Sequence, residues 1–291
     1  MYEIQLILTR LHEISGLATF SIAQAAGFFL IDCAVFLFEM YVVGWKKSSL
    51  FVVLTFEKTT RVDFFIWLTH LFGLFTILSF LFSLGVCYFL AGQIQKSFNF
   101  ELVHFIESGS IQFLIIYLIS DLKEYWKHFI FHKWILLWEI HAFHHSAQRF
   151  NMLTAYRFHY LQTAIGSFFD VIPFVLLGAP IQTYFAVKIL GLVHGLLVHS
   201  NWEHDWGVIG KYVLVSPAAH RIHHSEKKQH FNKNFGGTFI FWDRLFGTYH
   251  SAEPVHVLGI PDNKFNKKGL LHDLFLPVFR IAKRLMGRAV S

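Results

Sequence analysis

Charged side chains are scarce in this chain. Asp, Glu, Lys and Arg account for 15% of the 291 residues, whereas about 25% is usual in a soluble domain. Hydrophobic residues account for 54%, and the mean hydropathy is +0.46. Intrinsic disorder is excluded because it requires high charge and low hydrophobicity. A soluble protein with a single core is disfavoured.

Cysteine is also scarce. Cys33 and Cys87 both lie inside apolar runs, which favours small buried hydrophobic residues over a disulfide framework. Two cysteines cannot hold an iron–sulfur cluster, and no haem or flavin module is recognisable. Residues 1–16 contain a single Lys or Arg, Arg10, so they lack the basic start of a cleavable signal peptide. The first long apolar run is therefore expected to be an uncleaved anchor.

Long apolar runs occupy much of the sequence. Residues 17–45 and 64–91 are each long enough to cross about 30 Å of hydrocarbon, and residues 104–120 form a shorter third run. Residues 161–178 and 181–198 flank Gly178-Ala179-Pro180 and are predicted to form a tight helical hairpin, either two short spans or a re-entrant dip. The sequence predicts an all-α integral membrane protein with three transmembrane helices plus this short hydrophobic hairpin.

The distribution of charge predicts how the chain is oriented. Residues 1–200 hold 12 basic and 12 acidic residues, whereas residues 201–291 hold 13 and 7, so the net charge of +6 lies in the last third. The loop at 46–63 has four Lys or Arg, which the positive-inside rule places in the cytoplasm. Residues 121–160 and the basic tail then lie on the same side, as a cytoplasmic helical cap. Nucleic acid is not an expected partner of so apolar a chain.

Composition divides the chain into three predicted regions. Residues 1–120 carry the transmembrane helices, residues 121–250 form a catalytic domain that includes the hairpin, and residues 251–291 form a basic amphipathic tail. In the tail, residues 264–288 mix basic and apolar side chains as a helix lying on a membrane surface does. A break in this helix is expected near Pro277.

Histidine is concentrated in one stretch. The chain has 19 histidines, and 12 of them lie between His128 and His224. Three boxes stand out: H-x3-H at 128–132, H-x2-H-H at 141–145 and H-x2-H-H at 220–224. On a helix, residues i, i+3 and i+4 share an arc of about 100°. Neutral imidazole binds iron, zinc, copper and nickel, and eight imidazoles exceed the four ligands of a tetrahedral zinc. The boxes therefore predict a two-metal centre.

Helical phase adds one geometric prediction. His141 follows His132 by nine residues, or about 900°, so a straight helix would place the first two boxes on opposite faces. If both boxes serve one site, the chain must turn within residues 133–140. Isolated histidines are interpreted instead as hydrogen-bonding or interfacial residues: His12, His70, His104, His159, His230, His250, His256 and His272.

The sequence resembles the fatty acid hydroxylase/sterol desaturase superfamily of membrane-bound, non-haem di-iron enzymes. The resemblance covers about residues 121–249 and rests on these segments: 121–128 (DLKEYWKH), 137–146 (LWEIHAFHHS), 199–201 (HSN), 216–225 (SPAAHRIHHS), 234–236 (NFG) and 242–249 (WDRLFGTY). Phe129 departs from the family, where Arg is common, and His204 is not part of the pattern.

The resemblance implies a site and a chemistry. Two iron ions would be held by His128, His132, His141, His144, His145, His220, His223 and His224, with His199 as a ninth ligand and His194 as a weaker candidate. His194 and His199 lie about 140° apart on a regular helix, so both reach one site only if the helix ends or distorts. Residues considered for orienting the ligands are Asp121, Glu124, Glu139, Asn201 and Asp243.

The implied reaction is the O2-dependent hydroxylation or desaturation of a lipid C–H bond, such as that of a sterol or fatty acyl chain. Electrons would come from an external cytochrome, ferredoxin or reductase. The alternatives are a zinc-dependent membrane lipid hydrolase or isomerase and, less favoured, a metal transporter, because the boxes follow the spans rather than lie within them. Zinc is also able to replace iron in isolated protein, since divalent affinity does not favour iron. The expected location is a bacterial inner membrane, with multiple passes and the site facing the cytoplasm.

Overall fold

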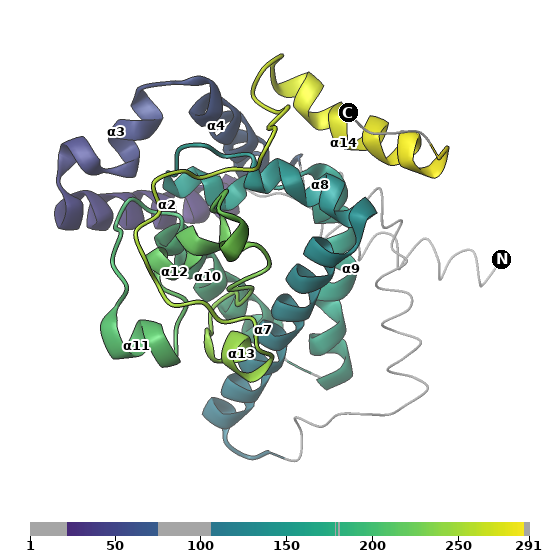
Figure 1. Ribbon diagram of the computed structural model, residues 1–291. Helices are drawn as coiled ribbons and strands as arrows, with labels where there is room; N and C mark the ends of the chain where they lie inside the picture. The colour runs from purple at the N-terminus through teal and green to yellow at the C-terminus, as the bar shows by residue number, and fades with distance from the viewer. Residues whose placement is uncertain (1–21, 75–105, 178, 180, 288–291) are drawn as a thin grey trace.

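A computed structural model describes residues 22–74, 106–177, 179 and 181–287. The described part is helical, as predicted, and contains no strand, only two isolated β-bridges. Its elements are α2 (Ile22–Val43), η1 (Trp45–Lys47), α3 (Ser49–Leu54), α4 (Lys58–Leu71), α7 (Gly109–Lys133), α8 (Ile135–His145), η3 (Met152–Tyr156), α9 (Tyr160–Leu177), α10 (Ile181–Val198), α11 (Gly207–Tyr212), α12 (Pro217–His223), η4 (Lys228–His230), α13 (Phe241–Leu245) and α14 (Leu270–Leu285). Helix α12 lies near the centre of this arrangement and α14 at its edge (Figure 1).

Only one of the three predicted transmembrane helices is supported by the described residues. Residues Ala25–Val43 of α2 are long and apolar enough to cross a membrane. The described part of the second predicted span belongs to the shorter α4, and residues 75–91 lie outside the described residues. The third apolar run joins α7, whose central turns carry Asp121, Lys123 and Glu124. The apolar run therefore continues into a charged helix rather than ending as a separate span.

Helix α2 turns its polar residues toward the protein and its apolar residues outward. Asp32 accepts hydrogen bonds from Tyr156 Oη (2.6 Å) and Trp67 Nε1 (2.8 Å). The buried carboxylate of Glu39 accepts one from the backbone N of Asn201 (2.8 Å). On the outside, Tyr41 is 89% exposed. Acidic residues within an apolar helix are tolerated when they face polar partners inside the protein.

The predicted hairpin is formed by α9 and α10, two helices of 18 residues each. It packs against α7 through a cluster that contains Ile116, Leu177 and Val187. Helix α10 also contacts α2 and η3, where Leu196 is fully buried. The hairpin is therefore built into the same helical assembly as the histidine boxes.

The predicted turn between the first two boxes is confirmed. Helix α7 ends at Lys133 and α8 begins at Ile135, with Trp134 in an extended conformation between them (φ −93°, ψ 117°). One non-helical residue is enough to change the direction of the axis, although Trp134 still bonds the carbonyl of Ile130. The second box can therefore face the first instead of pointing away from it.

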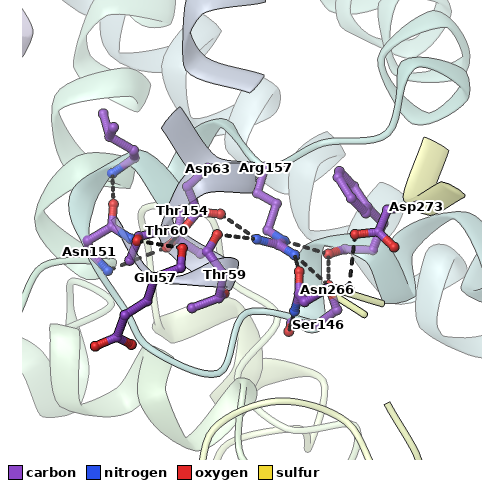
Figure 2. A network of polar contacts seen from close by, with 12 residues as sticks. Glu57, Thr59, Thr60, Asp63, Ser146, Asn151, Thr154, Arg157, Asn266 and Asp273 are labelled. Atoms are coloured by element: carbon purple, nitrogen blue, oxygen red, sulfur yellow. Dashed lines mark hydrogen bonds and ion pairs between the residues drawn. The ribbon is translucent and has the colours of Figure 1, made fainter. Parts of the chain in front are cut away.

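The segment that follows α8 is fixed by a fully buried arginine (Figure 2). Arg157 pairs with Asp63 of α4 (Nη1–Oδ1 2.6 Å) and donates to the carbonyl of Phe143 (3.0 Å) and to Ser146 Oγ (2.9 Å). It also donates to the side chain of Asn266 in the C-terminal tail. One guanidinium therefore joins α4, the end of α8 and the tail.

The C-terminal helix packs on the second histidine box. Leu270 and Leu274 of α14 contact a core that includes Ala142 and Phe143 of α8, and Glu139 of α8 pairs with two arginines of α14. The expected break near Pro277 is wrong, because α14 is continuous through this residue. Proline removes one helical hydrogen bond, but Pro277 is buried, and the packing of this helix outweighs that loss.

Candidate metal centre

Nine of the ten predicted site histidines gather in two neighbouring groups. In each group, one candidate ligand atom from every side chain lies within 4.8 Å of all the others. We call them group A and group B. Group A contains His128, His132, His141, His145 and His223; group B contains His144, His199, His220 and His224. The ring centroids of His145 and His224, one from each group, are 4.2 Å apart.

The order of the residues explains how the two groups arise. Residues i and i+4 share a helix face, whereas adjacent residues differ by about 100°. In the second box, His141 and His145 therefore enter group A and His144 enters group B. The third box has the reverse assignment, because His220 and His224 enter group B and His223 enters group A. Each H-x2-H-H box thus contributes to both groups, rather than pointing all its imidazoles into one volume.

The third box lies on a short helix with a strong N-terminal signal. Ser216 caps α12 by accepting a hydrogen bond from the backbone N of Ala219 (3.1 Å), and Pro217 occupies the first helical position. Both residue types favour a helix start at these positions. The Ser-Pro pair therefore sets where α12 begins and in which direction its histidines point.

Four imidazoles are oriented by hydrogen bonds from Nδ1. His128 bonds the carbonyl of Phe235 (2.9 Å), and His223 bonds that of Lys233 (2.8 Å). His199 bonds the carbonyl of Gly195 within its own chain segment (2.7 Å). His141 bonds Gln162 Oε1 (3.0 Å). A carbonyl can only accept, so Nδ1 must carry the proton and Nε2 keeps its lone pair.

The nitrogens inside the groups lack ordinary partners, and this is how the residues fit a metal. The Nε2 atoms of His128 and His223 are buried with no hydrogen-bond partner, and neither nitrogen of His224 has one. Elsewhere, imidazole nitrogens face each other, as with His132 Nε2 and His145 Nε2 at 3.0 Å. Buried polar atoms normally have partners. Divalent cations would satisfy these lone pairs, so both groups are suited to bind metal.

Burial keeps these imidazoles neutral. Desolvation lowers the pKa of His128 and His199 to about 4 and lowers the pKa of His224 well below 6.5. Neighbouring imidazoles add to the effect at His224, because protonating one ring disfavours a charge on the next. Neutral imidazole is the form that binds metal.

His194 lies outside both groups. Its Nε2 is buried without a hydrogen-bond partner, and its ring lies 5.8 Å from that of Trp206. Helix α10 remains regular to Val198, so the predicted difference in phase separates His194 from His199.

Two other histidines between the boxes also lie outside the groups. His204 is exposed and accepts from the backbone N of Trp206 (2.8 Å). His159 is buried and bonds the carbonyl of Leu274 (2.7 Å).

Two of the acidic candidates act on the site through a loop. Asp243 accepts from the backbone N of Phe235 (2.7 Å) and of Gly236 (2.8 Å). Asp121 accepts from the backbone N of Thr238 (2.8 Å) and from Trp242 Nε1 (3.0 Å). The loop held in this way presents the Phe235 carbonyl to His128. Both aspartates are therefore positioning residues, with no described hydrogen bond to an imidazole of either group.

The other three candidates have different partners. Glu124 pairs with Lys127, and Glu139 pairs with Arg284. Asn201 accepts from Arg221 Nη2 (3.0 Å). None of the three has a described hydrogen bond to a histidine of either group.

Sequence analysis missed Gln162, the residue that orients His141. Gln162 is a buried amide near the start of α9, whose run is otherwise strongly apolar. A single amide in such a run is a usable signal, because burying it requires a hydrogen-bond partner. The carbonyl partners of His128, His199 and His223 carry no such signal, since every residue has a carbonyl group.

The comparison with protein families covers the same region. Residues 113–248 match the fatty acid hydroxylase family model. The match begins in α7 and ends after α13, so it includes all nine histidines of groups A and B. This region, a little under half of the chain, is thus similar to the fatty acid hydroxylase family. The resemblance inferred from the boxes is thereby confirmed.

Several curated relatives share this family region. Ornithine lipid hydroxylase OlsE from Rhizobium tropici is 30% identical over 180 residues, which cover 62% of this chain and 54% of that protein. Alkylglycerol monooxygenase from Danio rerio is 33% identical over 161 residues, covering 54% and 35%. Cholesterol 25-hydroxylase from Mus musculus is 30% identical over 146 residues, covering 48% and 47%. The chain thus spans about half the length, or less, of these relatives. No solved structure matches it.

Proposed function

We propose that this protein is a membrane-bound, di-iron lipid hydroxylase that oxidises a C–H bond with O2. The observation that carries the proposal is the pair of adjoining, buried histidine groups with unpartnered nitrogens. The names of the three relatives described above, two hydroxylases and a monooxygenase, favour hydroxylation over desaturation. The nine histidines of groups A and B would serve as ligands. Two iron ions would supply the reduction of O2 and the oxidation of the substrate carbon.

The protein's own residues provide orientation and a dry environment. Phe158 stacks on His144 (ring centroids 4.9 Å apart), and Phe150 lies edge-on to His224 (4.8 Å). Trp138 and Phe235 each lie 5.0 Å from His132. This aromatic lining excludes water from a site where a reactive oxidant must be protected from side reactions. The Nδ1 hydrogen bonds keep the ligand rings in place.

The setting proposed is a multi-pass membrane protein of a bacterial inner membrane, with the site on the cytoplasmic side. Support comes from α2, which buries its acidic side chains and exposes its apolar ones, and from the basic C-terminal third. An apolar substrate would reach the site from the lipid phase, along the α9–α10 hairpin. A separate cytochrome, ferredoxin or reductase would deliver electrons.

The test is a comparison of lipids from cells with and without the protein, grown under 18O2. We expect lipid species heavier by one 18O atom only where the wild-type protein is present. His144→Ala and His223→Ala remove one ligand from group B and group A, respectively, and should each abolish this signal. The amount of protein in the membrane fraction should stay unchanged.

His204→Ala and His256→Ala serve as matched controls, because both histidines are exposed and lie outside the two groups. They should keep full activity. Identical lipid profiles with and without the wild-type protein would refute the proposal. If the zinc-loaded protein still changes the lipid profile in the absence of O2, a hydrolase would be favoured instead.

A further inference from the structure

A third cluster of metal-binding side chains lies outside groups A and B. His230 belongs to η4, whereas His250 and Glu253 follow α13, and one candidate ligand atom from each lies within 4.8 Å of the other two. His230 Nε2 is 3.0 Å from Glu253 Oε1, and the two imidazole centroids are 4.9 Å apart. We propose that these three residues form a separate site for one divalent transition-metal ion, with zinc as the best match.

The donor set fits zinc. Two imidazoles and one carboxylate are a known three-ligand combination for this ion, and water completes the tetrahedron. Bonds of about 2.0–2.1 Å place the ligand atoms of a tetrahedral site about 3.3 Å apart. His230 and Glu253 already satisfy that spacing, and the remaining separations need to close by about 1.5 Å at most. The side chains of His250 and Glu253 are partly exposed, so they have room to move.

The hydrogen bonds of the two histidines are compatible with metal binding. His250 bonds the carbonyl of Ser251 through Nδ1 (2.8 Å), which leaves the lone pair of Nε2 free. His230 is fully buried and directs Nε2 at Glu253, so Nε2 is the nitrogen that would bind the ion.

Lys227 competes with a cation for the carboxylate. Its Nζ lies 3.0 Å from Glu253 Oε1, and its side chain is 45% exposed. A bound metal would displace this ammonium group toward solvent at little cost. The competition separates two explanations of the cluster: removing Lys227 strengthens a metal site but weakens a purely structural salt bridge.

The site would brace the loop that serves group A. Asn234 donates to the carbonyl of His250 (3.0 Å) and accepts from its backbone N (2.8 Å). The preceding residue, Lys233, supplies the carbonyl that orients His223. A metal held by His230 and His250 would therefore tie together the two segments that carry this loop.

The test counts zinc bound by the purified protein after dialysis against micromolar zinc. Wild-type protein should bind one equivalent more than His250→Ala, that is, three against two when groups A and B hold the two ions proposed above. Glu253→Gln should bind the third ion at least tenfold more weakly. Lys227→Met should bind it about threefold or more tightly, the size expected when one partly exposed charge is removed. His256→Ala, an exposed histidine on the same segment, should bind three.

Retention of the two remaining equivalents by His250→Ala shows that the variant is folded. Equal counts in the wild type and His250→Ala would overturn the proposal. Loss of all zinc from His250→Ala would overturn it as well, because His250 would then act on the whole fold. The difference in zinc count between the wild type and His250→Ala depends neither on a lipid substrate nor on how many ions groups A and B hold, so its result is independent of the proposed hydroxylase activity.

Discussion

At the scale of single residues, the site depends on which nitrogen of each imidazole carries the proton. The carbonyls of Phe235, Lys233 and Gly195 and the amide of Gln162 accept from Nδ1 of four rings. Each acceptor fixes both the tautomer and the direction of Nε2. Gln162 is the only side chain among these four acceptors, so it is the one that substitution can remove.

Replacing Gln162 by leucine should impair group A without unfolding the protein. His141 would lose the acceptor for Nδ1–H, and loss of such a partner typically reduces metal affinity or activity by 10–100-fold. Gln162→Glu keeps an acceptor oxygen and should retain most of the function. Metal content and 18O incorporation are the measurements. Gln182→Leu, the same change at an exposed position of α10, should have no effect; equal losses in both variants would show that Gln162 has no specific role.

At the scale of elements, the loop between Phe235 and Asp243 connects α7 to the site. Its backbone N–H groups are held by Asp121 and Asp243, two buried carboxylates. Burial raises the pKa of both groups to about 6, although the hydrogen bonds that they accept act in the opposite direction. The loop is thus held by groups whose ionisation is costly in the folded protein.

The pKa of Asp243 predicts a pH dependence of stability. A folded-state pKa of about 6, against about 3.9 when unfolded, contributes stability that is complete below about pH 3.9 and is lost as the pH rises through 6. Asp243→Asn removes this titration. The unfolding free energy of the wild type, minus that of the variant, should fall by about 2 kcal/mol between pH 4 and pH 7.

Denaturant unfolding in detergent at several pH values measures this difference. Taking the difference between two variants cancels the titration of the histidines, which both proteins share. Asp262→Asn is the control, because Asp262 is exposed and its left-handed backbone (φ 51°) suits asparagine. A wild-type-minus-Asp243→Asn difference that does not change with pH would contradict the prediction.

At the scale of the whole molecule, one buried ion pair connects parts that are distant in sequence. Arg157 and Asp63 are both fully buried and 2.6 Å apart. Asn151 and Thr154 also donate to Asp63 (2.8 and 3.0 Å), and Arg157 reaches the end of α8 and the tail. The second histidine box is therefore held by contacts from both ends of the described chain (Figures 1 and 2).

Breaking this pair should destabilise the protein strongly. Removing one partner of a buried ion pair costs about 3–5 kcal/mol, because the other charge is left uncompensated. Arg157→Met and Asp63→Asn should each approach that range, and the double variant should lose clearly less than their sum. The measurement is a double-mutant cycle by denaturant unfolding. Arg149→Met, in an exposed pair with Glu57, should cost about 1 kcal/mol or less; additive losses at Arg157 and Asp63 would show that the pair is not coupled.

The site could be predicted from sequence further than the fold could. Box spacing identified eight of the nine histidines that come together, the family resemblance added His199, and helical phase required the turn that occurs at Trp134. Spans were predicted less well, because hydropathy measures composition and the third apolar run turned out to begin the charged helix α7. The continuity of α14 through Pro277 was missed because local propensity does not include tertiary packing.

The sequence by itself determined the ligand types, their spacing and the helical character of the chain, since these follow from residue chemistry and the 3.6-residue period. Only the tertiary structure decided that the three boxes and His199 meet in two adjoining groups, that Gln162 meets His141, and that His230 and His250 lie together. These outcomes depend on contacts between residues far apart in the chain. Such contacts are set by packing and by the need to pair buried polar groups, which no local pattern encodes.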